Sequence, residues 1–236
     1  MPVSIAAVDA IELELPGAHV RFTGRAGGVS SDQFASLNLG PATGDRPEHV
    51  RENLQRAADG LPVAAMRQVH GADVRTVTGP TGASEEADGL VTTEPGLALV
   101  VTTADCLPVG LAAGGAIAML HAGWRGLAAG ILEAGVQRLR ALAGSAPVHA
   151  AVGPGAGVCC YEVGDDVAAN FPGQVRGGRL DLKAAASERL RAAGVVTVLD
   201  VDRCTMCEPD VFFSHRRSGP TTGRQGGLIW HASSKD

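Results

Sequence analysis

The sequence predicts an α+β protein in which mixed β-sheets are layered and flanked by helices. Three observations support this fold class. The apolar runs are mostly short and β-branched, and helical patterns interrupt them too irregularly for a doubly wound sheet. Cys106 to Trp124 contains no Asp, Glu, Lys or Arg. Pro108 and the pair Gly114-Gly115 divide this stretch, which indicates a buried hairpin rather than a membrane span.

In the first half of the chain, short alternating runs predict a series of strands. Paired glycines within residues 25–30 indicate a loop, and Pro47–Ala58 is predicted to be a helix, with Asp45 as its cap and Gly60 as its stop. The predicted strands are Ile5–Leu15, Val20–Thr23, Ala65–Val69, Val74–Thr78, Gly89–Thr92 and Ala98–Thr103.

The second half mixes helices and strands. Ala116–His121 is predicted to be a strand, and Leu127–Ala143 a helix with its apolar residues along one face. Further strands are expected at 148–152, 195–199 and 228–230, helices at 165–170 and 182–193, and a loop at 219–227. We find no internal repeat or linker, so residues 1–236 are expected to form a single domain.

Composition limits the possible partners. The chain has 236 residues and a formal net charge of −5, which argues against nonspecific binding to nucleic acid or to an anionic membrane. It contains five cysteines, an odd number, and its strand-like start does not resemble a targeting segment. These features predict reduced thiols and a cytoplasmic protein, and they indicate no particular oligomeric state.

Three residues carry the strongest chemical signal. His70 lies in Gln-Val-His-Gly, Cys106 in Ala-Asp-Cys-Leu-Pro, and His121 in His-Ala-Gly-Trp-Arg-Gly, each at or near a predicted strand end. Any one of them alone is more simply explained as a packed residue. Together, two imidazoles and one thiolate suit Zn²⁺ and leave a coordination position open, as in catalytic sites. Asp105 either orients a ligand or caps a turn.

The remaining cysteines give a weaker signal. Cys204 and Cys207 have the spacing of a zinc knuckle, but a structural site needs four ligands and no second Cys-x-x-Cys is present. Ordinary packing is therefore expected for this pair, with a metal role left open. Cys159 and Cys160 are adjacent, and adjacent residues of a strand point to opposite faces. We therefore do not expect them to share a ligand role.

Several arginines lie in segments predicted to be loops, where two or three guanidinium groups together would hold an anion such as phosphate. For a single arginine, an ordinary surface position is the simpler explanation. Arg125 is the strongest candidate because it follows His121 by four residues at the predicted start of a helix. The set is Arg25, Arg125, Arg216, Arg217 and Arg224.

These motifs together resemble the YfiH-like family, known both as multicopper polyphenol oxidases (laccases) and as purine nucleoside phosphorylases, and also called peptidoglycan editing factor. The matching motifs run in family order over nearly the whole chain. One departure is His215, where the family usually has Tyr. The motifs are Arg25–Ser30, Ser36–Gly40, Gln68–Val74, Ala87–Gly89, Thr103–Val109, His121–Gly126, Gly153–Pro154, Tyr161–Gly164, Arg203–Thr205, Phe212–Arg217 and Thr222–Arg224.

The resemblance implies one α+β catalytic domain of layered sheets, distantly similar to cytotoxic necrotizing factor deamidases. It implies Zn²⁺ on His70, Cys106 and His121, and phosphate-dependent cleavage of adenosine, inosine, guanosine and methylthioadenosine, with adenosine deamination as a second activity. The expected partners are therefore purine nucleosides and phosphate. Within the matching motifs, Arg25 and Arg125 are candidates to hold phosphate and Asn38 to hold a sugar hydroxyl.

Two other classes remain open. One is a cysteine hydrolase acting on an amide of cell-wall precursors, with Cys106 as nucleophile and His121 or His70 as base. The other is a noncatalytic protein whose zinc is structural, with Cys204 or Cys207 as the fourth ligand. Laccase chemistry is disfavoured because the seven histidines form no His-x-His pair, although copper could occupy a His/Cys site adventitiously.

Overall fold

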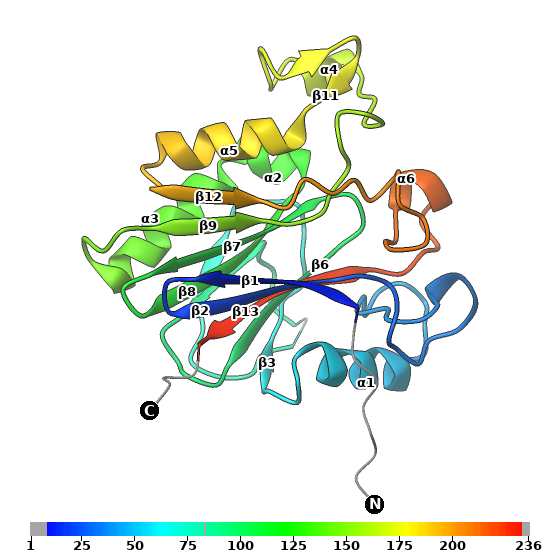
Figure 1. Ribbon diagram of the computed structural model, residues 1–236, viewed down its shortest axis with the longest axis horizontal. Helices are drawn as coiled ribbons and strands as arrows, with labels where there is room; N and C mark the ends of the chain where they lie inside the picture. The colour runs from blue at the N-terminus through cyan, green and yellow to red at the C-terminus, as the bar shows by residue number, and fades with distance from the viewer. Residues whose placement is uncertain (1–8, 83, 233–236) are drawn as a thin grey trace, which may run out of the picture.

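Two large β-sheets face each other, and helices cover both outer faces, so that the protein has four layers (Figure 1). The structure is a computed structural model that describes residues 9–82 and 84–232. The predicted α+β class with layered mixed sheets is confirmed. No helix within the described ranges is long and apolar enough to cross a membrane.

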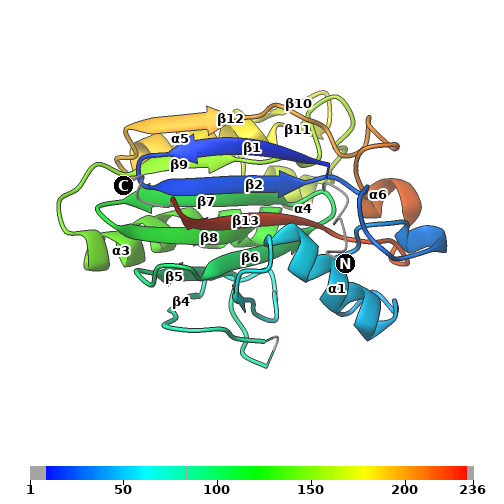
Figure 2. The same ribbon diagram turned by 60° about the horizontal axis from the view of Figure 1, so that its bottom comes forward.

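The first sheet has five strands in the order β1-β2-β13-β6-β3. All neighbours are antiparallel except β3 and β6, which are parallel. The last strand of the chain therefore lies between two early ones (Figure 2). The strands span Ala10–Leu15 (β1), Ala18–Thr23 (β2), Gln225–His231 (β13), Ala98–Thr103 (β6) and Val63–Ala64 (β3).

The second sheet has six strands in the order β12-β9-β7-β8-β5-β4, with parallel pairs at both edges. Its central hairpin, β7 and β8, is buried along its whole length because layers cover both faces. That double burial explains the long uncharged run and confirms the predicted hairpin. The strands span Thr197–Asp200 (β12), His149–Val152 (β9), Leu107–Ala113 (β7), Ala116–Ala122 (β8), Gly89–Thr92 (β5) and Val74–Thr76 (β4).

Apolar side chains fill the space between the sheets. Phe22 and Ile229 of the first sheet belong to one buried cluster with Ile117 and Met119 of the second. Because β-branched and small residues fill this layer, few aromatic side chains are needed. On the other face of the first sheet, helix α1 (Pro47–Ala57) packs through a smaller cluster that includes Val100.

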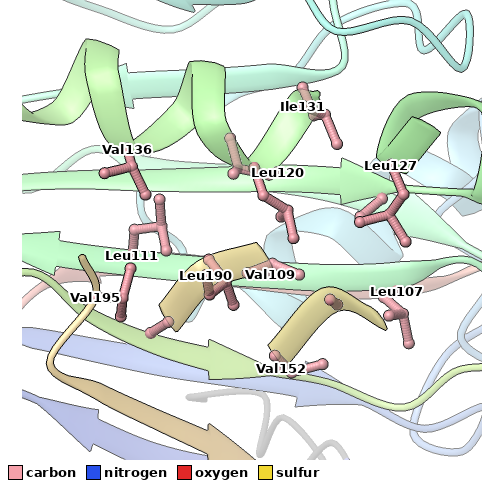
Figure 3. Close-up of a cluster of buried hydrophobic side chains, with 14 of the residues drawn as sticks. Leu107, Val109, Leu111, Leu120, Leu127, Ile131, Val136, Val152, Leu190 and Val195 are labelled. Carbon is pink, nitrogen blue, oxygen red and sulfur yellow. The ribbon is translucent and has the colours of Figure 1, made fainter. Parts of the chain in front are cut away.

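Three helices cover the outer face of the second sheet: α2 (Trp124–Ala129), α3 (Ile131–Ala143) and α5 (Leu182–Ala192). Figure 3 shows Ile131 and Val136 of α3 above Leu120 of the sheet. The remaining short elements are a 3₁₀ turn (Asp32–Phe34), α4 (Asp165–Ala168), the hairpin β10 (Val175–Arg176) and β11 (Arg179–Leu180), and α6 (His215–Ser218).

The predicted helix Leu127–Ala143 is wrong at two points. The helical segment begins earlier, at Trp124, and it is broken at Gly130, which has a φ of 91°. A residue in the left-handed region ends one helix, and glycine adopts that conformation without strain. The break makes α2 a separate short helix.

Other boundaries also need correction. The strand predicted at Ala65–Val69 is instead Val63–Ala64, and Arg67 forms only an isolated bridge. The predicted loop 219–227 ends early because β13 begins at Gln225; a Cβ at Gly227 would lie 2.4 Å from Pro108, so glycine permits this close strand packing. Helix α1 has no side-chain cap from Asp45. Residues 5–8 of the predicted strand Ile5–Leu15 lie outside the described residues.

Candidate metal centre and its cavity

His70, Cys106 and His121 come together although they lie far apart in the sequence. One donor atom from each lies within 4.8 Å of the other two. The two imidazole rings meet edge to face, with centroids 4.8 Å apart and an interplanar angle of 79°. This is a compact set of two nitrogen donors and one sulfur donor, so its chemistry and spacing fit one zinc ion.

The pairing of β7 with β8 places two of these residues side by side. Leu107 pairs with Ala122, so Cys106, just before β7, lies next to the end of β8, where His121 is. A Cβ at Gly123 would lie 2.8 Å from Cys106 Sγ and 3.1 Å from His70 Cδ2. The absence of a side chain at Gly123 therefore allows Cys106 and His70 to approach each other.

Asp88 supports the site, a role that was not predicted from the sequence. Its Oδ1 accepts hydrogen bonds from His121 Nδ1 at 2.8 Å and from the His70 backbone N–H at 2.9 Å, and its Oδ2 accepts from the Gly71 N–H at 2.6 Å. His70 has a φ of 61°, a strained value that these bonds stabilise. Because Nδ1 of His121 is bound to Asp88, Nε2 remains available for a metal.

Burial alone would raise the pKa of the Asp88 carboxyl, but hydrogen bonds from His121 and Gly71 outweigh it and hold that pKa below its usual value. Asp88 is therefore a buried carboxylate. The motif of Asp88, Ala-Asp-Gly, also suits an ordinary turn, so the sequence does not indicate that Asp88 orients the donors. This function depends on the contacts of β5 with β8 and with the loop at residue 70.

Asp105 acts on the turn before Cys106. Its Oδ1 accepts from the Thr205 hydroxyl at 2.7 Å, and its Oδ2 accepts from the Arg216 backbone N–H at 2.7 Å. Its φ is 89°. Of the two roles left open by the sequence, these contacts favour fixing the turn, which they tie to two distant segments.

Cys106 and His121 shift each other's proton affinity in opposite directions. Burial raises the pKa of the Cys106 thiol, but the charge and hydrogen bonds of His121 and His70 outweigh it and lower that pKa to about 6. Burial lowers the pKa of His121, but the Cys106 thiolate and the bond to Asp88 raise it to about 9. Without a cation, the pair is thus a thiolate and an imidazolium near neutral pH.

The three donors lie in a cavity of about 850 Å³, within the usual size range of small-molecule sites. Four arginines from separate segments line it: Arg67, Arg125, Arg216 and Arg224. Aromatic and imidazole rings line it as well: Trp124, Tyr161 and His215. The guanidinium of Arg125 lies 4.4 Å from the ring centroid of Trp124, and that of Arg216 lies 5.0 Å from that of Tyr161.

Two residues proposed to bind substrate are placed elsewhere. Arg25 donates to the carbonyls of Ala35 at 3.0 Å and Pro209 at 2.8 Å, and it is not among the residues lining the cavity. Asn38 is fully buried, and its amide oxygen accepts from the Arg224 backbone N–H at 2.9 Å. Both side chains therefore hold loops. Arg125 does line the cavity, whereas Arg67 was missed because it lies within the predicted strand Ala65–Val69.

The other four cysteines form a second group, which corrects the expectation for them. The thiols of Cys159, Cys160, Cys204 and Cys207 all lie within 4.8 Å of one another. Residues 158–160 form a turn rather than a strand, so the side chains of adjacent cysteines need not point to opposite faces. Among the described residues, Cys204 and Cys207 belong to this group and not to that of His70, Cys106 and His121.

The chain is similar to known proteins over most of its length. Residues 19–232 match the family described as multi-copper polyphenol oxidoreductase laccase. The chain is 41% identical over 230 residues to purine nucleoside phosphorylase YfiH of Escherichia coli K12, covering 87% of this chain and 90% of that protein. It is also 41% identical over 234 residues to purine nucleoside phosphorylase ORF3 of Streptomyces griseus, covering 90% and 94%. The crystal structure of YlmD from Geobacillus stearothermophilus matches with a TM-score of 0.86 at 34% identity, covering 96% and 97%.

Proposed function

This chain belongs to the family described as multi-copper polyphenol oxidoreductase laccase, and on that premise we propose that residues 1–236 form one catalytic domain that cleaves purine nucleosides with phosphate. Relatives named purine nucleoside phosphorylase support the reaction class. The observation that carries the proposal is the convergence of His70, Cys106 and His121 in a cavity also lined by arginines and aromatic rings.

The proposed cofactor is Zn²⁺ on His70, Cys106 and His121. The donor set fits, because two imidazoles and a thiol of low pKa are borderline-soft ligands and leave room for a further one. When bound, Zn²⁺ supplies Lewis acidity at an open coordination position. Asp88 orients His121 and the His70 turn, so it acts as a positioning residue.

Copper also suits two histidines and one cysteine, so the donor set alone does not exclude it. A multicopper oxidase centre needs many more imidazoles, however. Among the seven histidines, all within the described residues, only His70 and His121 join a metal-type cluster. We therefore disfavour laccase chemistry and regard copper at this site as adventitious.

Phosphate is proposed to bind beside the donor group, where Arg125, Arg216 and Arg224 line the cavity. Phosphorolysis joins a phosphate oxygen to C1′ of the ribose and breaks the C1′–N9 bond, whose electrons leave with the base. Guanidinium groups from three segments would neutralise the phosphate and fix its direction. Trp124 and Tyr161 offer ring faces for the purine, which stacks on aromatic side chains.

Adenosine deamination is proposed as a second activity of the same cavity. It is supported by the donor set with an open position, an arrangement that zinc deaminases also use. His215 also lines the cavity. We therefore expect this residue to affect which nucleoside is preferred.

One observation favours a second candidate function. The thiolate of Cys106 beside the imidazolium of His121 is the pair that cysteine hydrolases use, and the pKa values of about 6 and about 9 fit that role. Such an enzyme would act on an amide, as in cell-wall precursors, and would work without metal. Dependence on a cation thus separates the two candidates.

The test follows adenosine turnover with and without phosphate, separating adenine, inosine and hypoxanthine by chromatography. Phosphate-dependent adenine formation, absent from Cys106→Ala, is the expected result, and inosine formed without phosphate would show deamination. Equal product traces from the two proteins would contradict the proposal. Metal-independent cleavage of an amide substrate would support the hydrolase instead.

A further inference from the structure

Four cysteines form a compact group outside the cavity residues described above. The Sγ atoms of Cys159 and Cys207 are 3.3 Å apart, those of Cys160 and Cys207 are 3.0 Å apart, and all four lie within 4.8 Å of one another. None of the four is in a disulfide. Around a tetrahedral zinc ion, sulfur atoms lie about 3.8 Å apart, given a Zn–S bond of about 2.3 Å. The four thiols are therefore close enough together to bind one such ion, with the two shortest sulfur–sulfur distances below that value.

Two distant loops build this group. Gly155 and Cys204 form an isolated parallel bridge, and the Thr205 N–H donates to the Gly155 carbonyl at 3.1 Å. A Cβ at Gly157 would lie 3.2 Å from both Cys159 Sγ and Cys204 Cβ. The loops thus approach closely at a glycine, and each contributes two thiols.

The backbone around Cys204 is arranged as in thiolate metal sites. The Gly157 N–H points at Cys204 Sγ, with a nitrogen–sulfur distance of 3.3 Å. Such N–H groups stabilise sulfur that carries negative charge and orient it toward a metal. The Cys-x-x-Cys spacing of Cys204 and Cys207 gives the turn that two ligands of one ion commonly share.

A positive side chain lies directly against this turn. Arg217 Nη1 donates to the Thr205 carbonyl at 2.6 Å and to the Met206 carbonyl at 3.2 Å. A zinc ion with four thiolates carries a net charge of −2, so a fixed guanidinium beside it is favourable.

We propose that Cys159, Cys160, Cys204 and Cys207 bind one structural Zn²⁺, separate from the ion proposed for the cavity. Binding exchanges the four thiol protons for Zn²⁺ and changes no oxidation state. All four coordination positions are filled by protein, so this ion takes no part in substrate chemistry. The proposal uses none of the cavity residues and stands independently of the proposed reaction.

The site would brace one wall of the cavity. Cys160 is followed by Tyr161, which lines the cavity, and Cys204 is followed by Thr205, whose hydroxyl holds Asp105 in the turn before Cys106. An ion that joins the two loops would fix both connections. Losing it should loosen both the Tyr161 wall and the contact of Thr205 with Asp105.

The test measures the zinc content of the parent and variant proteins by elemental mass spectrometry, after purification with reductant and dialysis against Zn²⁺. Cys159→Ser/Cys207→Ser should lose one equivalent relative to its parent, both in the wild-type background and in Cys106→Ala. The second background shows that the lost ion is not that of the cavity. If the cavity site binds no zinc, the double cysteine variant should still contain one equivalent less zinc than its parent. The two proposals can therefore be tested separately.

Co²⁺ provides a second readout, in which all four cysteines of the group stay intact. Cys106→Ala loaded with Co²⁺ should show the thiolate-to-cobalt charge transfer and visible bands of a tetrahedral sulfur site. Equal zinc content in the cysteine variant and its parent, with no such spectrum, would overturn the proposal. Disulfides among these four cysteines, in protein purified with reductant and dialysed against Zn²⁺, would also overturn it.

Discussion

At the scale of single residues, the donor atoms were the easiest part to recognise. The residue types of His70, Cys106 and His121 indicate metal binding, and the structure brings all three together. The residues that orient them were not predicted. Asp88 reaches the site only through the pairing of β5 with β8, a contact between segments that no local pattern predicts. Local patterns indicate which side chains can bind, whereas long-range pairing decides which side chains orient them.

Replacing Asp88→Asn tests its positioning role. The amide cannot accept the same set of hydrogen bonds, so His121 and the His70 turn lose their fixed orientation. Zinc affinity at the cavity site should fall by about 10- to 100-fold, measured by competition with a chromophoric chelator. Asp73→Asn, an exposed acid of the same region, is the matched control and should bind zinc as the wild type does. Wild-type affinity in Asp88→Asn would show that the carboxylate is dispensable.

Alkylation of metal-free protein tests the thiolate of Cys106. Its pKa of about 6 predicts a rate that rises through that pH and is level above pH 7, because the thiol has already lost its proton there. Desolvation and a hydrogen bond with Cys207 raise the pKa of Cys159 to about 11, so Cys159 should stay slow up to pH 9. Peptide-resolved mass spectrometry with iodoacetamide separates the two. A midpoint for Cys106 near 9 would contradict the predicted ion pair, and added Zn²⁺ should protect Cys106.

Arg125→Ala tests the phosphate site. Because a charge-assisted hydrogen bond contributes about 1.5–3 kcal/mol, the KM for phosphate should rise by about 10-fold or more while the KM for adenosine changes little. Initial rates over a series of phosphate concentrations measure both. Arg51→Ala, an exposed arginine of α1, is the control. An unchanged KM for phosphate would remove Arg125 from the proposed site.

At the scale of elements, the uncharged run divided by Pro108 and Gly114-Gly115 predicted the central hairpin, and the predicted helix Pro47–Ala58 matches α1 to within one residue. Glycines caused two of the errors. Gly130 breaks a helix that looks continuous, and Gly226 and Gly227 lie inside a strand that looks like a loop. Their effect depends on how closely neighbouring segments pack, which a single sequence does not display.

Gly123→Ala tests the close approach at the end of β8. The new Cβ would lie 2.8 Å from Cys106 Sγ, so the donors must separate. We expect zinc binding at the cavity site and turnover to be largely lost while the protein still melts cooperatively. Zinc content measures the binding, and circular dichroism measures the melting. Gly79→Ala meets nothing within 4 Å and is the control. Full zinc content in Gly123→Ala would show that the donors do not need this contact.

At the scale of the whole molecule, the two metal-type clusters are built from different segments. The first uses the loop at His70, the residue before β7 and the end of β8, and the second uses two loops. The first was predicted because its members stand in distinctive motifs. The second was missed because adjacent cysteines were treated as strand residues, and because its four members come from two loops that only the fold brings together. The layered α+β architecture followed from strand-like runs and irregular helices, whereas the order of strands in each sheet did not.

The central claim is that one zinc ion on His70, Cys106 and His121 supports phosphorolysis of purine nucleosides. The most direct measurement adds Zn²⁺ stepwise to metal-free protein and records adenine formed from adenosine and phosphate. We expect the rate to rise with zinc bound at Cys106, to depend on phosphate, and to be zero in Cys106→Ala at every zinc concentration. Full turnover in the metal-free protein, or equal turnover in the variant, would contradict it.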